Sequence, residues 1–237
     1  MKKLFCLLII ILLATVTFSQ IPNTLTRKEM KKGWVLLFNG NDLEGWTNLK
    51  GQPIQGKGWE LTNGELSTVK GSKGGDIITL NQYSDFDLKL DYKIESGCNS
   101  GVKYFFTKYD IGGNLGLEFQ ILDDVLAEDN KLKNHLCGSL YDVLSPDESK
   151  KIINPPGQWN KIRILSKGYN VEHWLNGKKI LSYTRGDKAF TEGVAKSKFS
   201  KTVPAFGMVE KGNILLQEHG GLVSFRNIKI RELKNKK

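Results

Sequence analysis

The chain has 237 residues, a formal net charge of +10 at pH 7 and 39% hydrophobic residues. A chain of this length commonly forms one all-β domain. The basic surplus could suit nucleic acid, but the lysines are scattered and gather only at the C-terminal tail, without an Arg-rich helix or zinc-finger spacing. We therefore expect a solvated basic surface and no nucleic-acid partner. The sequence has no Gly-rich phosphate loop, G-x-S-x-G elbow or H-E-x-x-H motif, so nucleotide, hydrolase-elbow and zincin chemistry are set aside.

The first residues predict export. Two lysines precede an apolar run over residues 4–13, and small or polar residues follow. This is the layout of a secretory signal peptide, with cleavage after Ser19. A membrane anchor is the alternative, but the run is shorter than the ~20 residues that a spanning helix needs. Cys6 lies too early to be a lipoprotein cysteine. We expect a signal peptide over residues 1–19, no membrane anchor, and a periplasmic or secreted protein.

The residues that follow predict one short helix. Thr26 and Glu29 lie three apart in the pattern of a capping box, and Gly33 suits the position just past a helix end. We assign residues 20–32 to an N-terminal extension that carries this helix. Residues 33–234 are then a single domain.

This domain reads as a succession of short strands. Apolar and charged residues alternate through Phe86–Ile94, so one face of that strand is buried and the other faces water. Alternation or a short apolar run recurs over residues 34–38, 59–61, 65–67, 117–121, 161–165, 171–175 and 223–231. Asn63-Gly64 and Asn176-Gly177 supply the positive φ angles of tight hairpins. We predict an all-β fold, a sandwich of two packed antiparallel sheets.

Two cysteines remain after the signal peptide, Cys98 and Cys137. In an oxidising compartment such a pair can form a disulfide, provided that the two Cα atoms lie within ~7 Å. The alternative is two small buried side chains. The sequence leaves both open.

The segment from Glu118 to Asp123 is the first candidate for chemistry. Glu118 and Gln120 point the same way from one strand, and Asp123 follows near the strand's end. Carboxylates on a sheet surface backed by apolar residues suit proton transfer, because partial burial raises a Glu pKa toward the working pH. The alternative is that Glu118 simply faces solvent.

A second candidate lies in the segment 97–106. Its two glycines, around Asn99 and Ser100, predict a tight turn that leads into a strand carrying Lys103 among aromatic residues. Such a lysine could stabilise a developing oxyanion. It could equally extend its ammonium to water over apolar neighbours.

The histidines and aromatic residues give weaker signals. The three histidines show no spacing typical of metal ligands. His173 lies on a predicted strand and His219 precedes a Gly-Gly turn, and an isolated histidine is more often a hydrogen-bonded structural residue. Tyr141 and Trp46 could stack on a sugar ring or belong to the core.

Taken together, these segments resemble a known family. The blocks that carry the resemblance occur in the family's order: LFNGNDLEGW, WELTNGEL, FDLKLDYKI, NSGVKYF, GLEFQILDD, GSLYDV, GQWNKIRI, VEHWLNGKKI, SKF, FGMVEKGNILLQEHGG and VSFRNIKIREL. The chain resembles, over about residues 33–233, the 3-keto-disaccharide hydrolase domain family, formerly a domain of unknown function. One departure is the lysine-rich loop at 125–133, which lacks the His-Pro-Asp sequence of close relatives.

The resemblance implies a concanavalin-A-like lectin/glucanase sandwich, a jelly roll, that cleaves 3-keto-glycosides. A separate sugar 3-dehydrogenase would first oxidise the 3-hydroxyl, which makes the C2 proton acidic. A general base would remove this proton to give an enolate. The C1 substituent would then leave, and water would add or the enone would be released.

For the residue roles, the resemblance and the pattern together suggest Glu118 or His173 as the base, and Lys103 or a bound cation beside the enolate. A divalent metal ion held by Glu118 and a histidine such as His173 would serve the same electrostatic role. The sugar would be oriented by Gln120, Asp123, Tyr141, His219, Asn99 and Trp46.

Two other functions fit the same sandwich. One is a non-catalytic carbohydrate-binding module, because a fold does not dictate a function. The other is a conventional glycoside hydrolase, since Glu118, Gln120 and Asp123 resemble the E-x-D-x-x-E pattern of laminarinase-type enzymes with an altered central acid. A retaining glycosidase needs two carboxylates ~5–5.5 Å apart, which Glu118 and Asp123 would have to supply.

Overall fold

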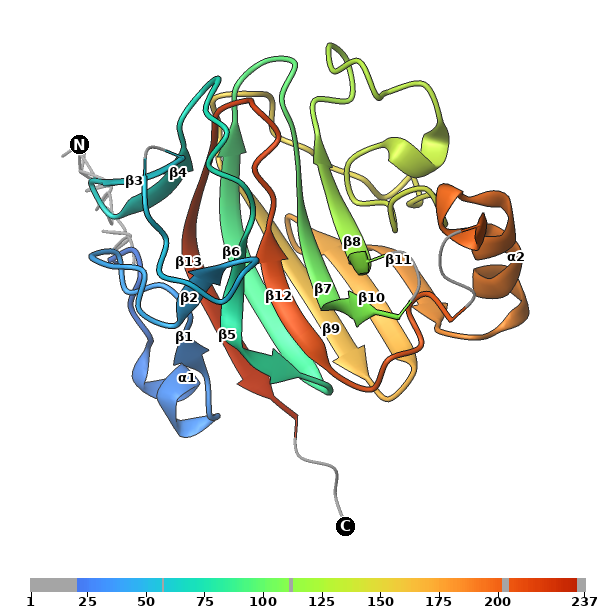
Figure 1. The fold of residues 1–237 in the computed structure, drawn as a ribbon, viewed down its shortest axis with the longest axis horizontal. Helices are drawn as coiled ribbons and strands as arrows, with labels where there is room; N and C mark the ends of the chain where they lie inside the picture. The colour runs from blue at the N-terminus through green and yellow to red at the C-terminus, as the bar shows by residue number, and fades with distance from the viewer. Residues whose placement is uncertain (1–20, 57, 111–112, 202–204, 234–237) are drawn as a thin grey trace, which may run out of the picture.

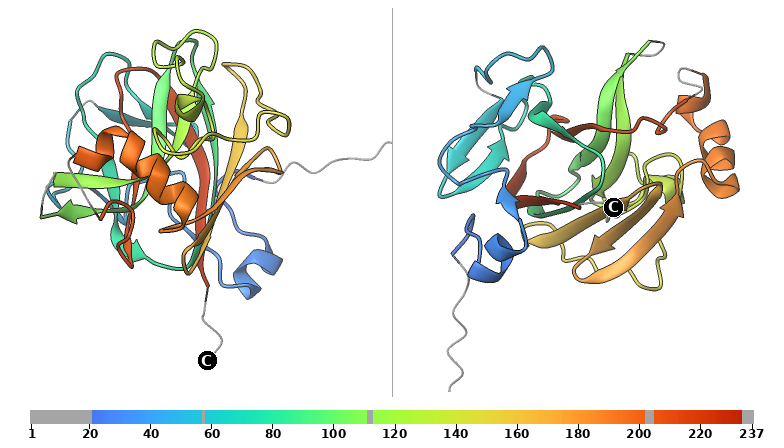
Figure 2. Two further views of the ribbon diagram at one scale, coloured as in Figure 1. Left: turned by 90° about the vertical axis from the view of Figure 1, so that its right-hand side faces the viewer. Right: turned by 90° about the horizontal axis from the view of Figure 1, so that it is seen from below.

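The computed structural model of the protein describes residues 21–56, 58–110, 113–201 and 205–233 (Figure 1). The expected signal peptide over residues 1–19 and the last residue of the expected domain, 234, lie outside the described residues. Within the described chain, two antiparallel sheets pack face to face, with the five-stranded sheet in front in Figure 1 and the eight-stranded sheet behind it. The right-hand view in Figure 2, which is seen from below, shows the same two layers edge-on. The predicted all-β two-sheet sandwich is confirmed.

The eight-stranded sheet has the order β11-β10-β9-β6-β13-β4-β3, and β1 pairs with β13. Its strands are, in chain order, β1 (Val35–Leu36), β3 (Trp59–Thr62), β4 (Glu65–Thr68), β6 (Phe86–Ile94), β9 (Asn160–Lys167), β10 (Asn170–Leu175), β11 (Lys178–Thr184) and β13 (Val223–Glu232). The alternating segment 86–94 is strand β6 itself. Asn63 and Gly64 adopt φ angles of 54° and 76° in the β3–β4 hairpin, the left-handed conformation that a type I′ turn requires.

The five-stranded sheet has the order β2-β5-β12-β7-β8. Its strands are β2 (Trp46–Asn48), β5 (Ile77–Tyr83), β7 (Asn99–Tyr109), β8 (Gly113–Leu122) and β12 (Gly212–Leu216). The longest two, β7 and β8, form a hairpin in which Lys103 lies directly opposite Glu118. The predicted turn before Lys103 is present, because Gly97 has a φ of +74° just before β7 begins.

Two α-helices and two 3₁₀ helices flank the sandwich within the described residues. Helix α1 (Arg27–Lys31) has the predicted capping box between Thr26 and Glu29. Helix α2 (Lys188–Lys196) was not predicted; it begins at the N-cap Asp187 and lies beside the sandwich at the right of Figure 1. The 3₁₀ helices are η1 (Lys133–His135) and η2 (Lys198–Lys201). No helix in the described ranges has the length and apolar character needed to cross a membrane.

The core fills the space between the sheets. Along each strand, every second side chain points inward. The fully buried large residues therefore come from both sheets and include Phe86, Leu88, Tyr104 and Phe119. The other side of each strand faces outward. On β7 and β8 these outward positions carry Lys103, Glu118 and Gln120, so the five-stranded sheet presents its polar residues on the face away from the core.

Candidate active site

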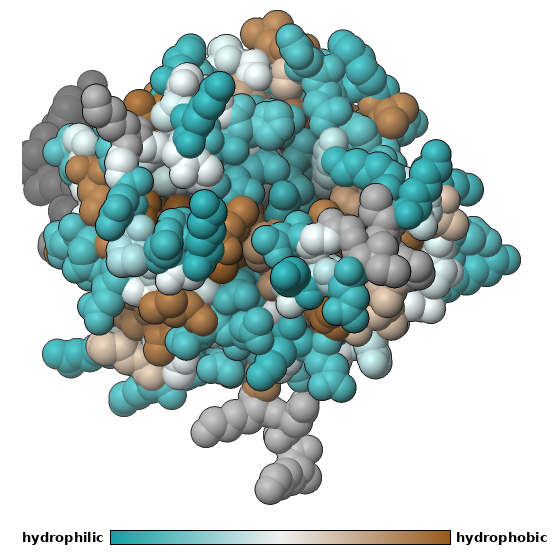
Figure 3. Space-filling model, in the orientation of Figure 1, coloured by the Kyte–Doolittle hydropathy of each residue, from teal (hydrophilic) through white to brown (hydrophobic). Residues whose placement is uncertain are grey.

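A cavity of about 680 Å³ lies on the outer face of the five-stranded sheet. Strands β7 and β8 form its floor, and its walls come from the loops after β8 and β12 and from η2. This face is hollowed and largely hydrophilic (Figure 3). The volume falls within the range of small-molecule sites, ~300–1,000 Å³, and therefore suits one or two sugar rings.

Glu118 lies at the floor of this cavity and is only 7% exposed. Its Oε2 is 3.7 Å from Nζ of Lys103, the residue directly across the strand pair. Burial raises the pKa of Glu118 above its ordinary value of 4.5, while Lys103 and Lys198 oppose this rise. The geometry therefore combines a desolvated carboxylate with two ammonium groups, which is the environment expected of a general base beside an anion-stabilising group.

The neighbours of Glu118 hold its carboxylate in place. In the orientation that satisfies both ends of the Gln120 amide, Nε2 lies 3.2 Å from Oε1 of Glu118 and 3.0 Å from the carbonyl oxygen of Ser100. In the same orientation, the oxygen of the Gln120 amide lies 3.3 Å from the side-chain amide of Asn99. Gly101 leaves room for the carboxylate, because a Cβ at this position would lie 2.2 Å from Oε1 of Glu118.

Tyr141 forms part of the cavity wall opposite Lys103. Its hydroxyl donates to Oδ2 of Asp129 at 2.9 Å, and Oδ1 of Asp129 lies 2.7 Å from Nδ1 of His135. The second nitrogen of His135 is 3.1 Å from Asp142. Burial and the nearby carboxylate of Asp129 raise the pKa of Tyr141, so its phenol stays neutral. This chain of contacts fixes the wall formed by the 123–144 loop.

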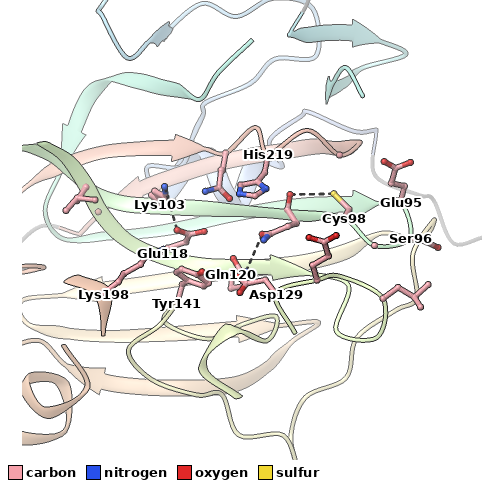
Figure 4. Close-up of a pocket in the computed structure, with 18 of the residues that line it drawn as sticks. Glu95, Ser96, Cys98, Lys103, Glu118, Gln120, Asp129, Tyr141, Lys198 and His219 are labelled. Carbon is pink, nitrogen blue, oxygen red and sulfur yellow. Dashed lines mark hydrogen bonds and ion pairs between the residues drawn. The ribbon is translucent and has the colours of Figure 1, made fainter. Parts of the chain in front are cut away.

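Lys198 and His219 approach the cavity from separate segments. The ammonium of Lys198, from η2, lies 4.4 Å from the ring centroid of Tyr141, and its backbone N–H donates to Asp142 at 2.8 Å. His219 follows β12, lines the cavity and remains exposed. Figure 4 places Lys198 and Tyr141 on one side of Glu118 and His219 on the other.

The structure thus brings six of the nine sequence candidates to one cavity: Glu118, Lys103, Gln120, Asn99, Tyr141 and His219. The other three, His173, Asp123 and Trp46, do not line it.

His173 belongs to the core, and its expected role as a base or metal ligand is corrected on this geometry. It is fully buried, with Nε2 2.6 Å from the hydroxyl of Tyr104 and Nδ1 3.0 Å from the carbonyl oxygen of Gly138. Burial lowers its pKa to about 4. The side chain therefore bridges the two sheets as a neutral imidazole and does not line the cavity that holds Glu118.

Asp123 and Trp46 have structural positions as well. The carboxylate of Asp123 accepts backbone N–H groups from Gly97 at 2.7 Å and from Val125 at 3.0 Å, which explains its lowered pKa. It organises the loop and does not face the cavity, so it cannot pair with Glu118 as the second acid of a retaining glycosidase there. Trp46 is buried and donates its Nε1–H to the carbonyl oxygen of Leu37.

The two cysteines are separate buried thiols in the structure. Sγ of Cys137 lies 3.2 Å from the hydroxyl of Tyr92 in the core, and Cys98 lies at the edge of the cavity. Burial raises the pKa of each thiol to about 12, so neither is a reactive thiolate at neutral pH. The sequence left open a disulfide or two small buried side chains, and the structure has the two buried side chains.

The expected metal pair does not fit this arrangement. Glu118 faces the cavity whereas His173 is enclosed in the core with both ring nitrogens hydrogen-bonded. In the part of the chain that the structure describes, no three His, Cys, Asp or Glu side chains are grouped so that they could hold a metal ion.

Comparison with known proteins agrees with this fold. Residues 33–231 match the model of a family described as the 3-keto-alpha-glucoside-1,2-lyase-like domain. The chain belongs to this family. It is 30% identical over 233 residues to a 3-keto-disaccharide hydrolase of Bacteroides thetaiotaomicron, a match that covers 85% of this chain and 79% of the relative.

Solved structures from Parabacteroides distasonis share the fold. One protein, provisionally named a glycosyl hydrolase, has a TM-score of 0.80 and 31% identity, with 90% of this chain and all of that chain covered. A second, also provisionally named a glycosyl hydrolase, has a TM-score of 0.64 and 30% identity over 84% of this chain and 99% of that chain. The family expected from the sequence is confirmed, and these relatives support a carbohydrate-active enzyme.

Several cavity residues of this 3-keto-alpha-glucoside-1,2-lyase-like domain were not predicted from its sequence. Asp129 and Glu128 come from the loop that departs from the family pattern, and Lys198 comes from the short SKF block. The only sequence feature that pointed to Lys198 was the block SKF, which occurs in the order typical of the family. Asp129 gave none, because its contact with Tyr141 depends on how the loop folds back over the sheet.

Proposed function

We propose that this protein cleaves 3-keto-glycosides by removing the C2 proton and eliminating the C1 substituent. The observation that carries the proposal is the buried carboxylate of Glu118, with a raised pKa, beside the ammonium of Lys103 in a cavity of sugar size. A base with a raised pKa is suited to abstract a carbon-bound proton near neutral pH. The family and the Bacteroides relative supply the substrate class.

The first step breaks the C2–H bond. The carboxylate of Glu118 takes the proton, and the electron pair moves into a C2–C3 double bond while the C3 carbonyl becomes an enolate oxygen. Lys103 lies next to Glu118 on the neighbouring strand, so its positive charge can stabilise this oxygen in a partly desolvated site. Oxidation at C3 is essential, because only the carbonyl makes the C2 proton acidic.

The second step breaks the C1–O bond. The enolate returns its electrons to the C3 carbonyl, a C1–C2 double bond forms, and the aglycone oxygen leaves and takes up a proton. Lys198, which lines the cavity beside Glu118, is the proton-bearing group suited to this role. Addition of water at C1 then gives the free 3-keto sugar, which makes the overall reaction a hydrolysis.

Gln120, Asn99 and His219 would orient the sugar hydroxyls. Their amide and imidazole groups offer both donors and acceptors along the floor and one wall of the cavity. The reaction requires a sugar 3-dehydrogenase to supply the keto substrate. We also propose that the protein works after export, as the first residues suggest, and N-terminal sequencing of periplasmic material beginning at residue 20 would support this.

The decisive experiment compares a p-nitrophenyl 3-keto-glucoside with its parent p-nitrophenyl glucoside. We expect nitrophenol release from the keto compound alone. Equal release from the parent glucoside would indicate a conventional glycoside hydrolase, and binding of either compound without turnover would indicate a carbohydrate-binding module. Either result would overturn the proposal.

A further inference from the structure

The outer face of the eight-stranded sheet, on the other side of the molecule from the cavity described above, carries a row of cations. Lys229, Lys89 and Arg163 lie directly opposite one another on the adjacent strands β13, β6 and β9. Trp174 on β10 continues this row beside Arg163. Like charges at directly opposed positions destabilise a sheet, so such a row needs compensation.

The two outer cations of the row have carboxylate partners. Arg163 donates to both oxygens of Asp87, at 2.7 Å and 3.0 Å, and Lys229 pairs with Glu29 of helix α1. These pairs neutralise the ends of the row. They also hold Arg163 and Lys229 in fixed positions on either side of Lys89.

Lys89, at the centre, forms no ion pair with any residue in the described ranges. Its Nζ lies 4.7 Å from the ring centroid of Trp34. Burial, Arg163 and Lys229 lower the pKa of Lys89, against the opposing effect of Asp87 and Glu29. The ammonium is thus half-buried among like charges, and a bound anion would offset that cost.

A second cavity, of about 530 Å³, opens over this row. Its polar lining offers hydrogen-bond donors and acceptors together: Lys89, Asp91, Lys161, Arg163, Arg226 and Asn227. The indole of Trp174 also lines it, with the guanidinium carbon of Arg163 5.3 Å from the ring centroid. Lys161 is exposed and, like Lys89, has no ion-pair partner in the described residues. The volume suits one or two sugar rings.

We propose that this second cavity binds an acidic saccharide, a sugar that carries a carboxylate or sulfate group, with Lys89 and Lys161 receiving the anionic group. Asp91 accepts from Nδ2 of Asn227 at 2.7 Å and from Nε of Arg226 at 3.3 Å, and this bonded group would meet the sugar hydroxyls with its remaining donors and acceptors. A nucleic acid fits less well, because Asp87, Asp91 and Glu172 alternate with the cations and would repel a continuous line of phosphates. The proposal is independent of the proposed reaction, which uses the opposite face.

The test measures binding by isothermal titration calorimetry with a sulfated chondroitin disaccharide, which carries both a uronate and a sulfate. Lactose serves as the neutral disaccharide, and a short DNA duplex as the alternative polyanion. We expect the sulfated disaccharide to bind more tightly than lactose or the duplex, and its affinity to fall as salt is raised.

Substitutions locate the site. Lys89→Met should weaken binding of the sulfated disaccharide about tenfold or more, and Lys161→Met should weaken it to a smaller extent. Lys211→Met, which removes an exposed lysine elsewhere, should leave binding unchanged. Thermal unfolding of each variant confirms that it is folded. If Lys89→Met does not fold, the effect of Lys161→Met on binding tests the proposal in its place.

The proposal is overturned if the sulfated disaccharide does not bind, if lactose or the duplex binds as tightly, or if neither Lys89→Met nor Lys161→Met weakens binding. Turnover of a soluble 3-keto-glucoside is measured on the same variants. If a variant loses saccharide binding but keeps full turnover, the result supports a separate site. If it loses both binding and turnover, the result contradicts a separate site.

Discussion

Lys103 lowers the proton affinity of the buried Glu118 from across the β7–β8 strand pair. Its ammonium, 3.7 Å from the carboxylate, favours the charged form and limits the rise in the pKa of Glu118 that burial causes. The base acts as a carboxylate, so kcat/KM should fall as pH drops through the pKa of Glu118, which lies above its ordinary value of 4.5.

Lys103→Met should therefore move the acid limb of the kcat/KM–pH profile to higher pH, by about one unit or more, because the pKa of Glu118 rises when the neighbouring charge is lost. Turnover should also decrease, since the enolate loses its cation. Lys108→Met on the same strand, where the lysine is exposed, is the matched control and should leave the profile in place. An unmoved or downward-shifted acid limb in Lys103→Met would show that Glu118 is not the titrating base.

Gly101 is a second residue whose effect can be separated from general destabilisation. A Cβ there would lie 2.2 Å from Oε1 and 2.8 Å from Cδ of Glu118, so Gly101→Ala must displace the carboxylate. A displaced base reduces turnover by about 100-fold. Made in a Glu118→Gln background, the same substitution should cause little further loss, because the group that it displaces no longer acts. Equal losses in both backgrounds would mean that Gly101 acts by another route.

At the scale of elements, strand alternation explains why much of the fold could be predicted. Strands with one solvent-facing side, such as β6 and β9, can be recognised in the sequence because apolar and polar residues alternate along them. Strand β12 is buried on both faces and gives no such pattern, and the nine residues of α2 are too few for a convincing helical period. Those elements are positioned by tertiary contacts that the sequence does not display.

The same alternation explains which of the candidate residues lie together in the cavity and which do not. Period 2 placed Glu118 and Gln120 on one face, but the register that sets Lys103 opposite Glu118 depends on the hairpin as a whole. His173 shares its face with Val171 and Leu175, both buried, so alternation alone indicates a core position. Asp129 and Lys198 reach the cavity through loops, whose paths no periodicity predicts.

His173 ties β10 of one sheet to Tyr104 on β7 of the other. Because burial lowers its pKa from 6.5 to about 4, the unfolded chain binds a proton at a higher pH than the folded protein does. The free energy of unfolding should therefore fall by about 3 kcal/mol as pH is lowered from about 6.5 to about 4.

His173→Gln should remove that part of the pH dependence, while lowering stability at pH 7 through the altered contacts with Tyr104 and Gly138. Urea unfolding of wild type and variant at pH 7 and at pH 4.5 measures the difference. The idea fails if both proteins lose the same free energy of unfolding between the two pH values.

At the scale of the whole molecule, the sandwich separates two tasks. Its interior is closed by aromatic and aliphatic packing, and its two outer faces are free to carry different polar surfaces. One face holds the cavity with Glu118, and the other holds the cation row with Lys89. In the two proposals, the excess of basic residues behind the net charge of +10 has a different role on each face: Lys103 would stabilise an enolate on one, and Lys89 would bind an anion on the other.

The most direct test of the account is the rate of 3-keto-glucoside cleavage by Glu118→Gln, which keeps the shape of the side chain and removes its basicity. We predict that kcat falls at least about 100-fold with an intact fold by circular dichroism, while Glu60→Gln, an exposed strand position, retains the wild-type rate. A loss smaller than about tenfold in Glu118→Gln, about 1.4 kcal/mol in barrier height, would contradict the assignment of Glu118 as the base.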